Sequence, residues 1–229
     1  MFVSIIVPVY NEARLVPEVV NRLSTLSDPR WHYELIFVDD GSTDETAAVL
    51  TRVARQHVVL SHRKNCGKGA ALRTGFAACR GDVIVTFDAD MEYDPLDLPS
   101  LIAPVANDDA PVVYGTRMVD DNPVGYHAYY FGNWLIASLT NLLYNSRLTD
   151  VETGIKVFRR DVLRAIPLKR NDFGFEVEVT ALLLRRGVPI IEKPIHYQPR
   201  TFSQGKKIGW RDGIIALSLL LKYRFFSLV

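Results

Sequence analysis

The stretch from Val83 to Asp94, VIVTFDADMEYD, constrains the fold of this chain more than any other. Its first residues are apolar and mostly β-branched, which predicts a strand buried on both faces, and the polarity changes abruptly at Asp88. Open α/β sheets bind ligands at the carboxyl ends of their strands. We therefore expect Asp88, Ala89 and Asp90 to lie at a ligand-binding edge of such a sheet.

Two carboxylates one residue apart suit a hard divalent cation. Asp88 and Asp90 can both reach one ion, and Glu92 is a third candidate oxygen ligand. An Mg²⁺ or Mn²⁺ ion held by so few carboxylates keeps open positions for the phosphate oxygens of a nucleotide. For an isolated pair of this kind a solvated turn or a helix cap is the commoner explanation, so the assignment depends on the rest of the chain.

Strands and helices alternate over the first half of the chain. Besides the run that begins at Val83, the apolar runs that predict strands are 3–9, 34–38, 58–61 and 111–115. Helical spacing follows the first two runs, and an alanine-rich helix is expected over 70–78. This pattern predicts an α/β fold with a doubly wound, mostly parallel sheet and helices on both faces.

The turns after the first two strands carry polar side chains. Tyr10 and Glu12 lie on the first strand-to-helix turn, and Asp40 follows the second strand. An acidic side chain at such an edge can accept a hydrogen bond from a nucleobase N–H or a ribose hydroxyl. The alternative is that 39–44 only builds a turn and a helix cap, and for Asp44 we favour the cap.

Length and composition narrow the class of protein. The 229 residues suffice for one large α/β domain or two small ones, and the net charge of +1 argues against a nucleic-acid binder that works through bulk charge. Cys66 and Cys79 form neither a disulfide framework nor a zinc pattern, which fits a reducing cytoplasm. The glycine-rich stretch 65–69 lacks the Walker pattern, which argues against a P-loop kinase or ATPase.

Five separated motifs resemble those of family 2 glycosyltransferases with the GT-A fold, in the branch that makes dolichyl- or polyprenyl-phosphate sugars. They are PVYNE at 8–12, VDDGSTD at 38–44, NCGKGAAL at 65–72, DADMEYDP at 88–95 and YGTR at 114–117. The segments at 148–163 and 194–213 resemble further parts of that branch, so the likeness covers nearly the whole chain. Five motifs in the right order are far more specific than any one of them.

This resemblance implies roles for individual residues. The residues that would hold the base and the ribose are Pro8, Tyr10, Glu12, Val38 and Asp40. Asp88, Ala89 and Asp90 would hold the diphosphate through Mg²⁺ or Mn²⁺. A glutamine often stands in that branch where this chain has Glu92, which leaves direct coordination by Glu92 open.

Cationic residues match those that the branch places around the sugar diphosphate and the acceptor phosphate. They are Arg117, Arg200 and Lys206. Arginine offers paired hydrogen bonds to phosphate oxygens and lysine offers a mobile point charge; the alternative for each is a surface salt bridge. Arg200 beside the run Gly205-Lys206-Lys207 predicts a mobile lid over the diphosphate.

Further acidic residues lie in the second half of the chain. Asp150 is a candidate for organising the acceptor side and only weakly for base catalysis, because a phosphate acceptor is already ionised. Its alternative is an N-cap or a turn partner of Thr149 and Thr153. Glu176 and Glu178 would be about 200° apart on a helix, so we do not expect them to act as one pair.

Two stretches are rich in apolar and aromatic residues. Residues 126–148 predict one or two helices that either pack on the sheet or contact lipid. Residues 210–229 predict a basic amphipathic helix that suits an anionic membrane surface, with dimerisation or packing on the core as alternatives. The resemblance favours the membrane. The run Ile214–Leu221 is far shorter than the roughly 20 residues needed to cross a bilayer.

Together these features predict a single domain over 1–229, with a nucleotide-sugar half at 1–117, an acceptor half at 118–205 and a basic tail at 206–229. The resemblance implies that it transfers glucose or mannose, with inversion, from a UDP- or GDP-hexose to a polyprenyl phosphate at the cytoplasmic face of a membrane. Alternatives are a soluble or glycan hydroxyl acceptor, or a nucleotide-sugar-binding subunit without turnover. A second copy and a membrane protein are further candidate partners; nucleic acid is not.

Overall fold

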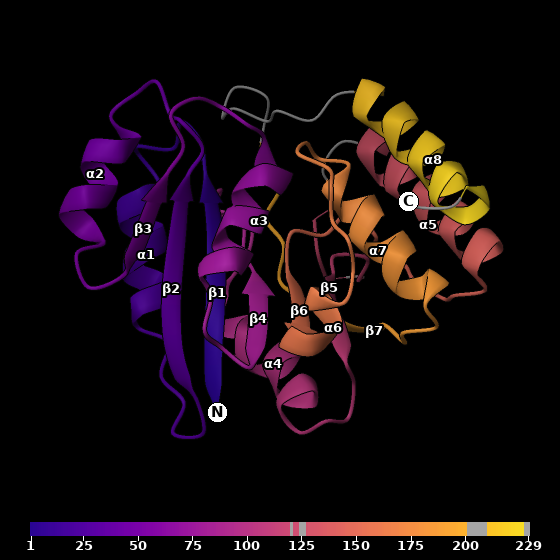
Figure 1. Ribbon diagram of the computed structural model, residues 1–229, viewed down its shortest axis with the longest axis horizontal. Helices are drawn as coiled ribbons and strands as arrows, with labels where there is room; N and C mark the ends of the chain where they lie inside the picture. The colour runs from indigo at the N-terminus through magenta and orange to yellow at the C-terminus, as the bar shows by residue number, and fades with distance from the viewer. Residues whose placement is uncertain (120, 124–126, 201–209, 227–229) are drawn as a thin grey trace.

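The computed structural model describes residues 1–119, 121–123, 127–200 and 210–226. Its centre is a seven-stranded sheet with the strand order β3-β2-β1-β4-β6-β5-β7 (Figure 1). The strands are β1 (Phe2–Val9), β2 (His32–Asp39), β3 (Val58–Ser61), β4 (Val83–Thr86), β5 (Val112–Thr116), β6 (Lys156–Arg159) and β7 (Ile191–Pro194). All neighbouring strands pair in parallel except β6, which runs antiparallel to both β4 and β5. The sheet is therefore mixed and mostly parallel.

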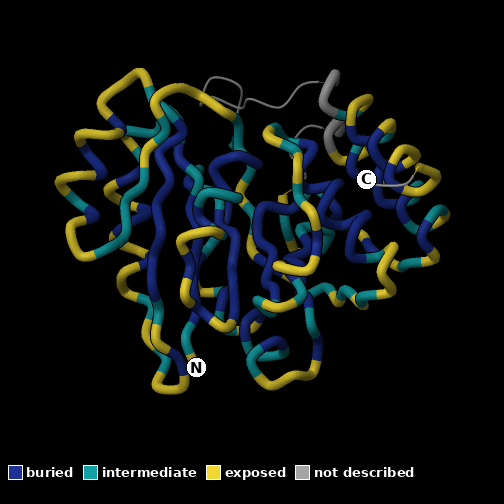
Figure 2. Tube along the Cα trace, viewed as in Figure 1, coloured by how far each residue is buried: buried dark blue, intermediate teal, exposed yellow. Residues whose placement is uncertain are grey.

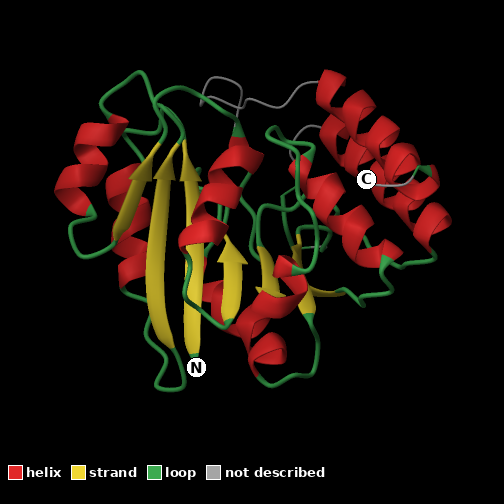
Figure 3. Ribbon diagram, in the orientation of Figure 1, coloured by secondary structure: helices red, strands yellow, loops and turns green. Residues whose placement is uncertain are grey.

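Helices cover both faces of the sheet (Figure 3). They are α1 (Val16–Ser24), α2 (Thr46–Val53), α3 (Lys68–Ala78), α4 (Leu98–Ala106), α5 (His127–Tyr144), α6 (Arg160–Arg164), α7 (Phe175–Arg185) and α8 (Trp210–Phe225), with a 3₁₀ turn η1 (Pro95–Asp97). One core contains side chains from α1, α2 and α4, and the other contains side chains from α3, α5, α7 and α8. Figure 2 shows the strands buried between these layers.

Successive side chains along a strand point to opposite faces of the sheet, so a strand such as β1 contributes to both cores. In β1, Val3, Ile5 and Val7 enter the first core while Ile6 enters the second. This is the period of two that a strand imposes on its side chains. The predicted strands are present, and the strand expected over 58–61 has those bounds. The helix expected over 70–78 begins earlier, at Lys68, because Gly67 takes a positive φ of 97° and turns the chain into the helix there.

The C-terminal helix α8 packs against α5 and α7, and its inner face belongs to the second core. The Tyr144 hydroxyl donates a hydrogen bond to the Leu220 carbonyl (2.9 Å), and the Tyr223 hydroxyl donates to Glu178 Oε1 (2.6 Å). The opposite side of α8 exposes large apolar side chains, among them Ile214, Leu221 and Phe225. The described part of the stretch 126–148, which starts at His127, contains one helix, α5, whose exposed aromatic side chains include Phe131 and Trp134. Within the described residues, no helix has the length and apolar character needed to cross a bilayer.

Candidate active site

A cleft of about 330 Å³ lies where β1, β2 and β4 end and residues from the second half of the chain approach. It gathers most of the side chains that the sequence predicts for the site: Pro8, Tyr10, Glu12, Asp40, Asp88, Ala89, Asp90, Glu92, Arg117 and Arg200. Val38 and Asp150 do not line it, and Lys206 lies outside the described residues together with the lid predicted around it. The cleft thus joins residues nearly 200 positions apart: Arg200 Nη1 lies 3.2 Å from Glu12 Oε1.

The turn after β1 is shaped by hydrogen bonds to the turn after β2. Asn11 has a φ of 54°, a left-handed conformation that asparagine tolerates. Its backbone N–H donates to Ser42 Oγ (2.9 Å), and its Oδ1 accepts from the Thr43 N–H (2.8 Å). The Glu12 N–H donates to Thr46 Oγ1 (2.9 Å). These bonds fix Tyr10 and Glu12 at the edge of the cleft.

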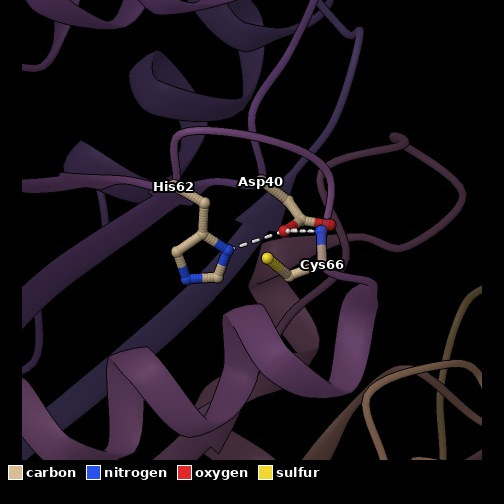
Figure 4. A group of neighbouring side chains, drawn as sticks. All are labelled: Asp40, His62 and Cys66. Carbon is tan, nitrogen blue, oxygen red and sulfur yellow. Dashed lines mark hydrogen bonds and ion pairs between the residues drawn. The ribbon is translucent and has the colours of Figure 1, made fainter.

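Asp40 ties the end of β2 to the loop before α3 (Figure 4). Its Oδ1 accepts from the Cys66 N–H (2.9 Å) and lies 2.7 Å from His62 Nδ1, and its Oδ2 accepts from the Gly67 N–H (2.7 Å). The ligand atoms of Asp40, His62 and Cys66 lie within 4.8 Å of one another, but the Asp40 and His62 atoms already bond to each other. We assign this group a structural role. The predicted contact of Asp40 with a base or ribose would use the acceptor capacity that Oδ2 retains.

Asp44 lies one residue before the N-cap of α2, which is Glu45, so the sequence expectation of a cap at Asp44 is off by one position. Its Oδ1 accepts from the Thr46 N–H (3.0 Å) in the first turn, and its Oδ2 accepts from the Ala13 N–H (3.4 Å). The helix α2 is the one that follows the second strand. Asp44 thus satisfies the N–H of the first helical residue, Thr46, which has no partner inside the helix, and links this turn to the turn after β1.

Asp88 and Asp90 reach the cleft from the loop that follows β4. Lys68 Nζ lies 2.8 Å from Asp88 Oδ1, and Asp90 Oδ1 accepts from the Glu92 N–H (3.1 Å). Burial raises the pKa of Asp90 to about 7, and the negative charges of Asp88 and Glu92 add to this. The positive charge of Arg200, with Nη2 3.5 Å from Asp90 Oδ2, and the hydrogen bond from the Glu92 N–H lower the pKa of Asp90 and partly offset this rise. A pair of repelling carboxylates at the edge of a polar cleft fits the donor set of Mg²⁺ or Mn²⁺.

Glu92 accepts hydrogen bonds from the opposite wall of the cleft. Its Oε2 accepts from the Tyr197 hydroxyl (2.9 Å), and its Oε1 accepts from the Arg200 N–H (2.7 Å). The Glu92 carbonyl also accepts from the Gln198 N–H (2.8 Å). These bonds hold segment 197–200 against the loop after β4. They give Glu92 an anchoring role, and direct coordination of a metal by Glu92 stays a prediction.

Asp150 lies behind the cleft and holds Arg117. Arg117 Nε donates to Asp150 Oδ2 and Nη2 donates to Oδ1, each over 2.7 Å. The Arg117 N–H also donates to Oδ2 (3.0 Å). Asp150 is completely buried, so its predicted role on the acceptor side would have to act through Arg117, which it orients.

A row of buried charges that the sequence did not predict forms the floor of the cleft. Lys68 Nζ lies 2.8 Å from Glu176 Oε1, and the other oxygen of Glu176 pairs with Lys156. Burial alone would lower the pKa of Lys68, but the negative charges of Asp88 and Glu176 outweigh it and raise this pKa above its usual value. Burial lowers the pKa of Lys156, which is inaccessible to solvent. The available signal was the motif NCGKGAAL, which places a lysine at the start of a helix beside two glycines.

Comparison with known proteins identifies the class to which this cleft belongs. Residues 4–166 match the family model described as "Glycosyl transferase family 2". The chain belongs to glycosyltransferase family 2. This confirms the family that the five motifs suggested.

Two curated glycosyltransferases of similar sequence are named undecaprenyl-phosphate 4-deoxy-4-formamido-L-arabinose transferase. The one from Shewanella sediminis (strain HAW-EB3) is 33% identical over 188 residues, which are 76% of this chain and 56% of that protein. The one from Enterobacter sp. (strain 638) is 31% identical over 211 residues, which are 89% of this chain and 62% of that protein. The chain therefore spans about three fifths of the length of these two relatives.

A solved glycosyltransferase structure shares the fold. Glucosyl-3-phosphoglycerate synthase from Mycobacterium tuberculosis, in complex with Mn²⁺, UDP-glucose and phosphoglyceric acid, superposes with a TM-score of 0.74 and 22% identity. The match covers 99% of this chain and 80% of that one. The same enzyme is solved with Mg²⁺ and UDP, at an equal TM-score of 0.74. At this identity the likeness shows the fold alone, and it confirms the predicted α/β, GT-A architecture.

Proposed function

We propose that this domain transfers a hexose, glucose or mannose, from a UDP- or GDP-sugar to a polyprenyl phosphate, with inversion at the anomeric carbon. The observation that carries the proposal is the meeting of Asp88 and Asp90 with Arg117 and Arg200 in one cleft. Carboxylates suited to a metal-bound diphosphate and guanidinium groups suited to a second phosphate are what a transfer between two phosphates requires. The names of the curated relatives, which act on undecaprenyl phosphate, support the choice of acceptor.

The donor half of the cleft would bind the nucleoside diphosphate. Asp88 and Asp90 would hold Mg²⁺ or Mn²⁺, and the metal would neutralise the charge that develops on the leaving diphosphate. The solved relative that contains Mn²⁺ and UDP-glucose supports both the metal and the class of donor. Pro8, Tyr10, Glu12, Val38 and Asp40 are proposed to contact the base and ribose, and Ala89 the diphosphate.

The acceptor half would bring a second anion to the sugar. Arg117 is held in place by Asp150 and can present its remaining N–H groups to a phosphate oxygen. That oxygen forms a bond to the anomeric carbon while the bond from this carbon to the diphosphate breaks, and the diphosphate leaves with the electron pair. Attack from the face opposite the leaving group inverts the configuration. The acceptor phosphate is already ionised, so this step needs no general base. Lys206 is proposed to assist Arg200 at the diphosphate.

A lipid acceptor requires contact with a membrane surface. The exposed apolar side chains of α5 and α8 are proposed to supply it, together with Lys222 and Arg224 in the last turn of α8. Phe131 and Trp134 stack with ring centroids 5.6 Å apart on the exposed side of α5. Aromatic and basic residues together favour the interface of an anionic bilayer. The proposed place of action is therefore the cytoplasmic face of a membrane, with peripheral attachment.

Transfer from radiolabelled donors tests this function. UDP-glucose, UDP-galactose, GDP-mannose and GDP-glucose would each be incubated with Mn²⁺ and vesicles that contain a polyprenyl phosphate. Label that enters the lipid fraction supports the proposal, and the free polyprenyl alcohol is the matched control acceptor. Transfer to the alcohol or to a soluble hydroxyl compound instead would favour the hydroxyl-acceptor alternative. Binding of donor without transfer to any acceptor would favour a non-catalytic subunit.

A further inference from the structure

One carboxyl oxygen of the cleft has no hydrogen-bond partner within the described protein. Glu152 lines the cleft, and its Oε1 is shielded from solvent without a hydrogen bond. Burial raises the pKa of Glu152 to about 7, and the charge of Glu176 adds to this. A shielded polar atom without a partner is costly, and natural proteins keep few of them. At a binding cleft, a ligand is the obvious source of the missing partner.

The other carboxylates that line the cleft are engaged in the protein itself. Their partners are Arg200 for Glu12 and Asp90, three donors around Asp40, Lys68 for Asp88, Tyr197 and Arg200 for Glu92, and two lysines for Glu176. Each of these groups helps to hold the walls of the cleft together. Within the described residues, Glu152 Oε1 accepts no hydrogen bond from the protein, which leaves its acceptor capacity for a ligand in the cleft.

The turn that carries Glu152 is fixed on both sides. Before it, Asp150 is bound to Arg117, and the Asp150 N–H donates to Glu192 Oε1 (2.8 Å). After it, the Gly154 N–H donates to the Tyr93 hydroxyl (3.0 Å), and a Cβ at Gly154 would lie 2.1 Å from Asp88 Oδ2. Glu152 is thus held between the residue that orients Arg117 and the residue that touches Asp88. In the proposed function, the hexose would lie between Arg117 and Asp88.

We propose that Glu152 accepts a hydrogen bond from a hydroxyl group of the donor sugar and so helps to select that sugar. A phosphate would be repelled by this carboxylate, whereas a sugar hydroxyl is a neutral donor of the kind that it lacks. The proposal rests on the proposed function, because it needs a nucleotide sugar in the cleft. It adds a specificity-determining residue on the donor side that is independent of the acceptor.

Calorimetry with the full chain and Mn²⁺ tests the inference without any acceptor. The probes are UDP and UDP-glucose, and GDP and GDP-mannose. For the pair that the wild-type protein binds, Glu152→Ala should weaken binding of the nucleotide sugar by about 10- to 100-fold, the usual worth of a hydrogen bond to a charged group. Binding of the free nucleoside diphosphate should not change. Glu152→Gln keeps a neutral oxygen acceptor and should lose less affinity than Glu152→Ala.

Deoxygenated donors identify the hydroxyl group. The donor that lacks the contacted hydroxyl should bind wild type and Glu152→Ala equally weakly, which is the coupling expected when both changes remove one hydrogen bond. Glu192→Gln is the matched control, because Glu192 bonds the same turn from outside the cleft. It should leave the preference between full and deoxygenated donor unchanged.

Three results overturn the inference. One is equal weakening of nucleotide and nucleotide-sugar binding by Glu152→Ala, which would mean that Glu152 only supports the fold of the site. Another is the absence of coupling with every deoxygenated donor. The third is no binding of either nucleotide sugar by the wild-type protein, which would overturn the proposed function as well. Donor binding that shows the coupling, without transfer to polyprenyl phosphate, would instead leave this inference standing and refute only the acceptor.

Discussion

The carboxylate of Asp150 accepts two parallel hydrogen bonds from the guanidinium of Arg117, Nε to Oδ2 and Nη2 to Oδ1, each 2.7 Å long. The side chain of Asp150 is completely buried and that of Arg117 is 15% exposed, so water screens this pair little. The guanidinium carbon of Arg117 also lies 5.2 Å from the centre of the Tyr197 ring. The arginine is thereby presented to the cleft in one orientation.

Removing the charge of Asp150 should lower both the free energy of unfolding and the transfer activity. Asp150→Asn leaves a buried guanidinium without its counter-charge, and loss of one partner of a buried pair typically costs about 3–5 kcal/mol. Urea unfolding measures this change, and transfer should fall because Arg117 is released. Glu18→Gln is the control, since it breaks an exposed pair with Arg22 and should change unfolding little. Wild-type stability in Asp150→Asn would contradict the assignment.

Asp90→Asn should abolish nearly all transfer while the fold is retained. The side chain lies at the edge of the cleft outside both apolar cores, so the change removes a proposed metal ligand and no packing. The rise in melting temperature on addition of Mn²⁺ should disappear with the activity. Asp94→Asn alters a carboxylate in the same loop that caps η1 outside the cleft, and it should keep the Mn²⁺ response. Full activity of Asp90→Asn at saturating Mn²⁺ would remove Asp90 from the metal site.

The effect of metal on stability should depend on pH. The pKa of Asp90 is raised from 3.8 to about 7 in the metal-free protein, so the folded state binds the proton more tightly than the unfolded chain does. This contribution to stability is present at low pH and is lost as the pH rises through the window between those two values. A metal that replaces the proton should therefore raise the melting temperature more at about pH 7.5 than at about pH 5.5. A response to Mn²⁺ that is the same at both values would argue against Asp90 as the titrating ligand.

Gly154→Ala should disturb the metal site through sterics alone. A Cβ at this position would lie 2.1 Å from Asp88 Oδ2, so the carboxylate must move away from its place beside Lys68. We expect weaker Mn²⁺ binding and slower transfer in this variant. Gly132→Ala is the matched control, because no neighbouring atom lies within 4 Å of its added Cβ, and it should stabilise α5 by about 0.5–1 kcal/mol. Unchanged Mn²⁺ affinity in Gly154→Ala would show that Asp88 can move without consequence for the ion.

Substitutions on the exposed side of α8 should weaken membrane attachment. Leu221→Ser combined with Phe225→Ser removes apolar surface without touching the buried side chains of the helix, so folding should persist. Flotation with anionic vesicles should fall for this variant and should fall for the wild type as salt is raised. Leu96→Ser, an exposed leucine in η1, is the control. Equal flotation of all three proteins would place the membrane contact elsewhere.

Local patterns predicted the first half of the sheet and most of the cleft. The buried strand before Asp88 and the motifs around Tyr10, Asp40 and Arg117 are continuous in sequence, and each brings its side chains to the end of a strand. A period of two and a change of polarity suffice to find such elements.

Long-range pairing accounts for what the sequence did not reveal. Strand β6 has only four residues, contains a lysine and inserts antiparallel beside β4, some 70 positions earlier in the chain. Its Lys156 is buried because Glu176, on a helix far along the chain, supplies the opposite charge. The anchoring of Arg200 by Glu92 is likewise a contact between distant segments. No periodicity within a short window encodes such partners.

The position of β6 in the sheet also sets when β4 can pair with its second neighbour during synthesis. β4 is made early, but one of its two neighbours is β6, whose last residue, Arg159, follows about 70 residues later. At a translation rate of about 5–20 residues per second, the edge of β4 waits roughly 4–15 s for that neighbour. An unpaired apolar strand edge is a site at which other chains pair and aggregate. The synthesis of residues 87 to 156 is therefore the interval in which this edge of β4 stands without its second neighbour.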